Sequence, residues 1–253
     1  MTVIGVSLKM YFGHARTLEW CREIRRLAQD HDAVRSGEAR LFVLPTFPSL
    51  AGAVEILSPI VAVGAQDLAT DDAGAFTGEV SGVELSEIGC SIAEIGHAER
   101  RRLFGETPEV VSEKVAAAFR AGLTPLVCVG EEEHGSPEEA LAVCLAQLDS
   151  ALSLAVERGH SGALMVAYEP VWAIGRPAPA PAEHVALVCQ GLRDRLGQLA
   201  DRGGSPVVYG GSAGPGLLTE IDEHVDGLFL GRFAHDPSAV RSILDEVHRL
   251  RAS

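Results

Sequence analysis

The sequence predicts an α/β fold, a single (β/α)8 barrel, and three observations lead to this prediction. Short apolar runs rich in β-branched residues recur along all 253 residues, segments with helical periodicity lie between them, and no long linker or change of composition divides the chain. Strands without inward–outward alternation are expected in a parallel sheet that helices cover on both faces. Alternating strands and helices form parallel βα units, and about eight such units in roughly 250 residues fit a closed barrel better than an open sheet. We therefore expect one domain over residues 1–253.

The predicted elements follow one another as strand, helix, strand along the chain. The expected strands are Val3–Val6, Leu41–Leu44, Val61–Gly64, Ser91–Ile95, Pro125–Val129, Leu164–Tyr168, Pro206–Tyr209 and Gly227–Leu230. The clearest helices are Thr17–Gln29, Pro108–Ala121, Pro137–Val156, Ala182–Leu199 and Pro237–Arg249. Pro108, Pro137 and Pro237 suit the first turn of a helix, where a missing N–H costs nothing, and Gly122 suits a helix end.

Composition and charge exclude several classes of partner. The formal net charge of −14 argues against a nucleic-acid surface, which needs clustered Lys and Arg, and against anionic membranes. The cysteines are odd in number and form no CxxC pair, which favours reduced, buried thiols over disulfides or a zinc site. The first residues lack the basic and long apolar regions of a signal peptide, and no uninterrupted apolar run approaches the length that spans a bilayer. We expect a cytoplasmic protein.

Polar side chains and glycines follow five of the predicted strands. Lys9 follows the first strand, His97 the fourth and Glu169 the sixth, while the glycine-rich turns 209–216 and 228–232 follow the last two. The carboxyl ends of barrel strands converge on one mouth, so these residues are expected to meet there. Glu169 lies in the apolar stretch AYEPVWAIG, where a carboxylate is costly unless it has a use.

These groups suit the abstraction of a proton next to a carbonyl. Glu169 would take the proton, His97 would donate to the carbonyl oxygen and stabilise the enediolate, and Lys9 would supply positive charge. His97 begins a helix-like run, and the helix dipole disfavours protonation of its imidazole. The N–H groups of glycine-rich turns and helix N-termini bind phosphate well, which indicates a phosphorylated substrate.

Five stretches of the chain carry a resemblance to a known family. They are GAQDLATDDAGAFTGEVSG (64–82), IGHAERRRLFGET (95–107), PLVCVGEE (125–132), AYEPVWAIG (167–175) and YGGS (209–212). In this order they resemble the triosephosphate isomerase family over essentially the whole chain, so the barrel is expected to be a TIM barrel. The resemblance implies a cofactor-independent isomerase of glycolysis or carbohydrate catabolism.

The resemblance also implies roles for single residues. It implies Glu169 as the base, His97 as the electrophile and Lys9 as the ammonium of the site, with Glu99 in a supporting place. The phosphate would be bound by main-chain groups at Gly175, Ser212, Gly231 and Arg232.

A closing lid and a dimer are implied in the same way. Pro170–Ala180 resembles the lid that excludes water from a reactive enediol. Tyr209 resembles the residue whose hydroxyl latches the closed lid, and Glu131 resembles the partner of the lid residue Trp172 in the open state. The stretch Gly74–Ser81 is similar to the loop that inserts beside a neighbour's site, so a homodimer is implied.

The chain departs from the family pattern around this one pocket. Ser7 stands where the family has a substrate-contacting Asn, and Ala98 stands where a Ser is usual. The far hinge of the lid reads Arg176-Pro177-Ala178-Pro179, and proline restricts φ, so this hinge should move less freely. Arg232 and Phe233 follow Gly231 in the phosphate loop, and Arg232 could make a bidentate phosphate contact or point to solvent. These changes, with the catalytic groups retained, predict an altered substrate.

Two substrates remain open for the isomerase. The first is dihydroxyacetone phosphate, converted to glyceraldehyde 3-phosphate, because the overall resemblance is to that family. The alternative is a four-carbon erythrulose phosphate, because the short side chain of Ser7 leaves space for an extra carbon. Two further alternatives are a Schiff-base lyase that uses Lys9 and a non-catalytic sugar-phosphate binder. The retained Glu169 and His97 count against the binder, because binding alone needs neither a base nor an electrophile.

Overall fold

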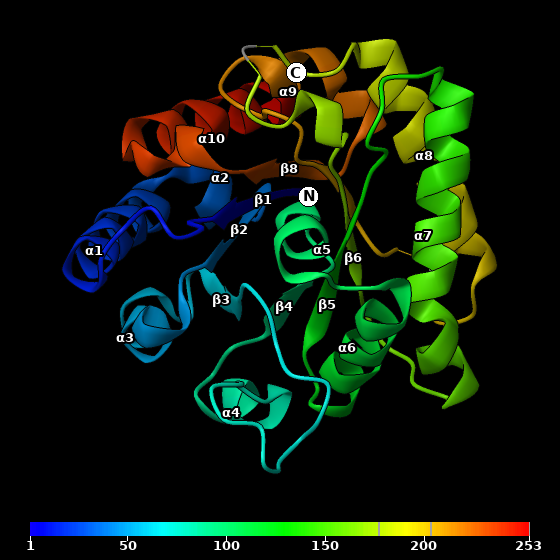
Figure 1. Cartoon of the computed structure of the whole chain (residues 1–253). Helices are drawn as coiled ribbons and strands as arrows, with labels where there is room; N and C mark the ends of the chain where they lie inside the picture. The colour runs from blue at the N-terminus through cyan, green and yellow to red at the C-terminus, as the bar shows by residue number, and fades with distance from the viewer. Residues whose placement is uncertain (177, 203, 253) are drawn as a thin grey trace.

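Eight parallel strands close into a barrel in the computed structural model, which describes residues 1–176, 178–202 and 204–252 (Figure 1). Neighbouring strands follow sequence order, and β1 pairs with β8 to close the barrel. The strands are β1 (Thr2–Ser7), β2 (Ala39–Leu44), β3 (Ala62–Ala65), β4 (Ile92–Ile95), β5 (Thr124–Val129), β6 (Met165–Tyr168), β7 (Val207–Tyr209) and β8 (Gly227–Leu230). The predicted (β/α)8 barrel is confirmed.

Helices surround the strands and include the five that the sequence predicts. The α-helices are α1 (His14–Asp30), α2 (Asp32–Arg35), α3 (Leu50–Leu57), α4 (Gly82–Glu87), α5 (Ala98–Phe104), α6 (Pro108–Arg120), α7 (Pro137–Glu157), α8 (Ala182–Gln198), α9 (Leu217–Ile221) and α10 (Pro237–Ala252). Short 3-10 turns cover Phe47–Ser49, Val171–Ala173, Asp222–His224 and Arg232–His235. Pro108 and Pro137 lie in the first turns of α6 and α7, as predicted. The shortest helices carry too few turns for their periodicity to be read from the sequence.

Both faces of the strands are buried, which explains why the sequence shows no alternation. The interior of the barrel is filled by one cluster of side chains from the strands, and a larger cluster fills the space between strands and helices. Phe42 and Phe229 stack inside the barrel with ring centroids 5.9 Å apart. Gly5 makes room for them, because a Cβ there would lie 2.1 Å from Cζ of Phe42.

Buried charges attach α5 and the loop after β3 to α6. The ammonium of Lys114 lies 2.6 Å from Asp67 and 2.5 Å from Glu106, and Arg100 of α5 lies 2.7 Å from Asp67. Removal of one partner would leave a buried charge unpaired, so this network holds α5 firmly at the mouth of the barrel.

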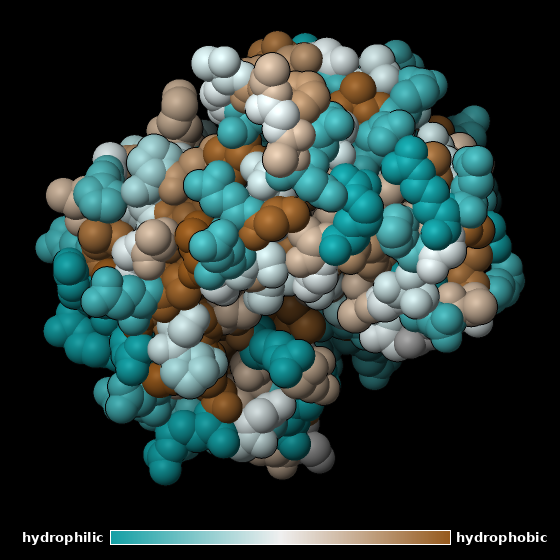
Figure 2. Space-filling model, turned by 90° about the horizontal axis from the view of Figure 1, so that it is seen from below, coloured by the Kyte–Doolittle hydropathy of each residue, from teal (hydrophilic) through white to brown (hydrophobic). Residues whose placement is uncertain are grey.

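The outer surface is mostly polar. Figure 2 shows one face on which apolar residues gather in small patches between hydrophilic ones, and which is hollowed near its centre. The five cysteines are buried and carry free thiols, as expected. One described helix, α7, is long and apolar enough to cross a membrane by length and composition alone; it packs against α6 and α8 on the outside of the barrel.

Candidate active site

The carboxyl ends of the strands bring the predicted residues to one cavity of about 500 Å³. Lys9 follows β1, His97 follows β4 and Glu169 follows β6, and all three line this cavity. The other predicted residues that line it are Ser7, Glu99, Gly175, Ser212, Gly231 and Arg232. Glu131, Trp172 and Tyr209 do not line it and lie beneath and within the lid.

Glu169 and His97 face each other without a hydrogen bond. Oε2 of Glu169 lies 3.4 Å from Nε2 of His97, and both atoms are buried with no hydrogen-bond partner among the described residues. Gly210 packs directly against the base, because a Cβ there would lie 2.7 Å from both Cγ and Oε1 of Glu169. The two free atoms leave an acceptor and a donor ready for a substrate.

The position of His97 at the start of α5 sets its tautomer. Its Nδ1 accepts a hydrogen bond from the main-chain N–H of Glu99 at 3.1 Å, so Nδ1 carries no proton. A neutral ring then carries its proton on Nε2, the atom that faces Glu169.

Lys9 is held in place by its backbone and by an ion pair. Its φ is +47°, a left-handed conformation that is rare outside glycine. The side-chain amide of Gln66 donates to the carbonyl oxygen of Lys9 at 3.1 Å, and Nζ of Lys9 lies 2.8 Å from Oε1 of Glu99. Burial by itself would lower the pKa of Lys9, but the hydrogen bond to Glu99 and the charge of Glu169 outweigh burial and raise this pKa. Lys9 is therefore an ammonium at neutral pH. Gln66 was not predicted from the sequence.

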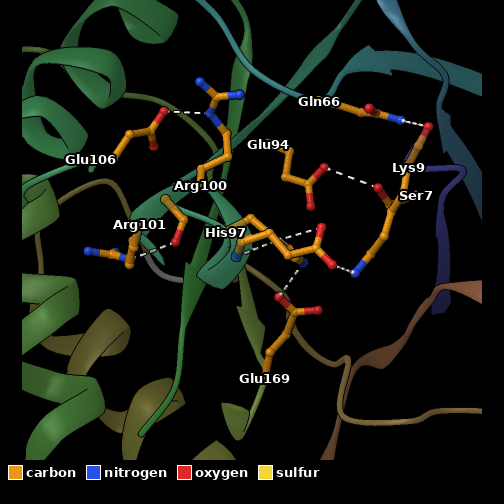
Figure 3. A network of polar contacts seen from close by, with 11 residues as sticks. Ser7, Lys9, Gln66, Glu94, His97, Arg100, Arg101, Glu106 and Glu169 are labelled. Atoms are coloured by element: carbon orange, nitrogen blue, oxygen red, sulfur yellow. Dashed lines mark hydrogen bonds and ion pairs between the residues drawn. The ribbon is translucent and has the colours of Figure 1, made fainter. Parts of the chain in front are cut away.

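Glu94, in the middle of β4, was also not predicted. Oγ of Ser7 donates to its Oε2 at 3.3 Å, and its Oε1 is buried with no hydrogen-bond partner among the described residues (Figure 3). Burial raises the pKa of Glu94 to about 7, and the charge of Glu169 adds to this shift. The signal was available, because a carboxylate in the apolar run SIAEIG is as costly as the one in AYEPVWAIG.

The other end of the cavity is rich in unusual backbone. Gly175 and Ser212 have φ values of +71° and +55°. Arg232 is exposed, and its Nη2 would lie 3.6 Å from a Cβ on Gly175, so its guanidinium is beside the lid at the mouth of the cavity. An anion at this end would meet main-chain N–H groups and one guanidinium.

Two hydrogen bonds hold the lid to the end of β7 and the turn after it. The hydroxyl of Tyr209 accepts from the N–H of Ala180 at 2.9 Å, and Oγ of Ser212 donates to the carbonyl oxygen of Ala173 at 2.8 Å. These bonds join the lid to the turn after β7, which is the latch expected of Tyr209. Pro177 of the far hinge lies outside the described residues.

Glu131 binds the lid from below. Its Oε1 accepts from Nε1 of Trp172 at 2.6 Å and from the hydroxyl of Tyr168 at 3.2 Å, and it lies 3.3 Å from Nε2 of His184. The contact between Glu131 and Trp172 was expected for an open lid, yet it occurs here together with the Tyr209 latch. The structure therefore contains both of the lid contacts that the resemblance implies.

Comparisons with known proteins agree with this geometry. The family model for triosephosphate isomerase matches residues 2–247. The chain is 55% identical over 249 residues to an L-erythrulose-1-phosphate isomerase of Pectobacterium atrosepticum, covering 98% of this chain and 96% of that protein. It is 40% identical over 228 residues to a triosephosphate isomerase of Halorhodospira halophila, covering 87% of this chain and 90% of that protein.

A solved structure has the same fold over its whole length. The crystal structure of triosephosphate isomerase from Bartonella henselae matches with a TM-score of 0.79 and 31% sequence identity, covering 98% of this chain and 99% of that chain. The protein described here is an isomerase, and the chain belongs to the triosephosphate isomerase family.

Proposed function

We propose that the protein isomerises L-erythrulose 1-phosphate, a four-carbon ketose phosphate, by proton transfer through an enediolate. The similarity that carries this proposal is the 55% identity over 98% of the chain to a protein named for that reaction, against 40% identity to a triosephosphate isomerase. The four-carbon alternative is thus better supported than the triose substrate that the sequence placed first. Ser7, in place of a longer amide, supports the same choice because it leaves room for a further carbon.

The cavity suggests a role for each catalytic group. L-Erythrulose 1-phosphate carries its carbonyl on C2 and a hydroxyl and a hydroxymethyl group on C3. Glu169 takes the proton from C3 while Nε2–H of His97 donates to the C2 oxygen, and the ammonium of Lys9 stabilises the negative charge that forms there. His97 moves the hydroxyl proton between the two oxygens. Glu169 then returns its proton to C2, and the carbonyl is left on C3.

The phosphate and the lid complete the proposed site. Main-chain N–H groups of Gly175, Ser212, Gly231 and Arg232 would bind the phosphate. The lid over Pro170–Ala180, latched by Tyr209, would keep water from the enediolate.

The test is a coupled assay with purified protein on L-erythrulose 1-phosphate and on dihydroxyacetone phosphate. We expect the larger kcat/KM for the four-carbon substrate, and a loss of about 10²–10⁴-fold in Glu169→Gln, with a smaller loss in Glu169→Asp. Glu133→Gln, an exposed carboxylate outside the cavity, is the matched control and should retain full activity. A larger kcat/KM for the triose would contradict the substrate, and binding of phosphate ligands without any turnover would contradict the isomerase.

The structure gives little support to a Schiff-base lyase. Imine formation needs a neutral amine, and the ion pair with Glu99 and the raised pKa keep Lys9 protonated. Borohydride should therefore trap no adduct on Lys9 in the presence of substrate, while carbonyl shift continues. A trapped lysine adduct would support the lyase instead.

We also propose a homodimer formed through the loop Gly74–Ser81. This loop lies in the segment between β3 and α4 (cyan in Figure 1), which extends away from the barrel, and Phe76 at its tip is 48% exposed. Met10, on the loop after β1, and Phe104, at the end of α5, are 89% and 68% exposed. A second copy that covers these exposed apolar side chains would remove them from water.

The remaining proposals concern the setting of the enzyme. We propose that residues 1–253 act as one domain, because the family match covers residues 2–247 without a break. We propose a cytoplasmic enzyme of carbohydrate catabolism that needs no cofactor, because proton transfer by Glu169 and His97 requires none.

A further inference from the structure

We infer that Glu94 and Ser7 form a subsite that binds the terminal hydroxymethyl group of the four-carbon substrate. This inference rests on the proposed function, because a triose phosphate has no such group. Glu94 is a specificity-determining residue in this view, and Ser7 positions it.

Glu94 and Ser7 meet across the inside of the barrel. Ser7 ends β1 and Glu94 lies on β4, two strands that are not neighbours, and Oγ of Ser7 lies 3.3 Å from Oε2 of Glu94. Each residue is only 3% exposed. In Figure 3 the second carboxylate oxygen of Glu94 points toward the space between Lys9, His97 and Glu169. Ser7 therefore lines the cavity, and Glu94 lies directly behind it, close to the groups that handle the proton.

The subsite has hydrogen-bonding capacity that no described residue uses. Oε1 of Glu94 is buried and has no partner among residues 1–176, 178–202 and 204–252. A buried polar atom without a partner is costly, and a ligand hydroxyl that donates to it removes that cost. Ser7 uses its one proton on Glu94, so its oxygen still has room to accept.

The orientation of the substrate in the cavity places its fourth carbon near Ser7 and Glu94. For proton transfer, C3 has to lie beside Glu169 and the C2 oxygen beside Nε2 of His97, so C1 and its phosphate extend toward Gly175 and Gly231. The fourth carbon then extends the other way, from C3 toward the ends of β1 and β4. Ser7 lines the cavity there, and Glu94 lies directly behind it.

The chemistry of Glu94 matches a hydroxyl better than a second charge. Its raised pKa, about 7, means that near neutral pH it is present both as an acceptor and as a neutral donor. A hydroxyl can pair with either form, because it both donates and accepts. A methyl group pairs with neither form, and an anionic group pairs only with the protonated form.

The test compares two substrates in two variants. Glu94→Leu keeps a similar volume among apolar neighbours, and replacement of a buried charge by an apolar side chain usually leaves a folded protein. We expect kcat/KM for L-erythrulose 1-phosphate to fall about 10- to 100-fold, the size of one hydrogen bond to a charged group, and kcat/KM for dihydroxyacetone phosphate to change less than about threefold. Glu94→Gln, which keeps a polar group, should lie between wild type and Glu94→Leu.

A substrate without the terminal hydroxyl tests whether Glu94 acts on that group. Wild type should turn over 4-deoxy-L-erythrulose 1-phosphate about as poorly as Glu94→Leu turns over the full substrate, and the deoxy substrate should lose nothing further in that variant. An equal loss on both natural substrates, or an additive loss with the deoxy substrate, would overturn the subsite. A wild-type preference for dihydroxyacetone phosphate would overturn the proposed function itself, so the two failures are distinguishable.

Discussion

Glu169 and Glu94 are two carboxylates in otherwise apolar stretches of the barrel, and their different surroundings suit them to different roles. Glu169 stands at the end of β6 with one oxygen facing His97 across 3.4 Å. Glu94 stands one layer deeper on β4, where Ser7 binds one of its oxygens and the other has no partner among the described residues. The first arrangement suits proton transfer to a substrate carbon, and the second suits recognition of a hydroxyl.

Gly210 should be essential for activity, because only a residue without a side chain leaves the Glu169 carboxylate in its place. In Gly210→Ala the new Cβ would lie 2.7 Å from Cγ and Oε1 of Glu169, so the carboxylate has to move. We expect kcat to fall at least about tenfold, since a shift of about 1 Å at a reacting group costs up to about 10²-fold.

Steady-state kinetics on the four-carbon substrate checks this expectation. The control is Gly197→Ala in α8, where a Cβ meets nothing within 4 Å; it should retain activity and gain about 0.5–1 kcal/mol of stability. An unchanged kcat in Gly210→Ala would contradict the prediction, because it would show that the Glu169 carboxylate tolerates the added Cβ.

Glu94 should make the stability of the fold depend on pH. Its carboxyl has a pKa of about 7 when folded and a reference value of 4.5, so the folded state holds this proton longer than the unfolded state. Below pH 4.5 both states are protonated and the residue has no pH effect; as pH rises from 4.5 to about 7 the free energy of unfolding falls, and above pH 7 the full cost remains. The cost is on the order of 3 kcal/mol.

Urea unfolding of wild type and Glu94→Gln between about pH 4.5 and pH 8 measures this linkage. The variant should be the more stable protein at the alkaline end, and the difference between the two should shrink toward the acid end. A difference that does not vary with pH would contradict the raised pKa of Glu94.

At the scale of elements, the short helix α5 sets the site. It spans Ala98–Phe104, yet its first turn fixes the tautomer of His97 through the N–H of Glu99, and the Glu99 side chain binds Lys9. Nε of Arg101 donates back to the carbonyl oxygen of Gly96 at 2.6 Å, which anchors the helix to the strand before it. The buried ion pairs of Lys114 then hold α5 against α6 through Arg100 and its partners.

The lid is the second element with a separate role. In Tyr209→Phe the N–H of Ala180 loses its acceptor, so the latched lid is less stable by the worth of about one hydrogen bond. We expect kcat/KM to fall about 2- to 10-fold, and the enediolate to lose phosphate more often because water and protons reach it.

Inorganic phosphate released per turnover is the measurement for the lid. Ser212→Ala, which removes the second lid contact to Ala173, should act in the same direction. If Tyr209→Phe is slower but releases no additional phosphate, the hydroxyl of Tyr209 contributes to packing and does not hold the lid closed.

For the whole molecule, the apolar loops around the mouth suggest that the proposed dimer completes the site. Phe76→Glu places a charge at the tip of the protruding loop and should convert the dimer to monomers with lower isomerase activity. Sedimentation velocity at matched concentrations checks this. Val156→Glu, also at an exposed apolar position but on α7, is the control and should not change the oligomeric state. A monomeric wild type would contradict the proposal.

Much of the fold could be predicted because its signals are local. Each strand is a short apolar run, and the long helices α1, α6, α7, α8 and α10 carry several turns of periodicity. The short helices were missed because they are stabilised by caps and by their neighbours. Ser81 at the start of α4 shows this: its side chain accepts from the N–H of Glu84, and no periodicity indicates that cap.

The sequence by itself determined the closed barrel and the meeting of Lys9, His97 and Glu169, because in a barrel every strand end reaches the same mouth. Only the tertiary structure decided that Ser7 binds Glu94. That contact joins residues 87 positions apart on strands that are not neighbours, and it depends on which way each side chain points into the barrel. The physical reason is that burial, and with it the cost of an unpaired oxygen, exists only once the barrel has closed around it.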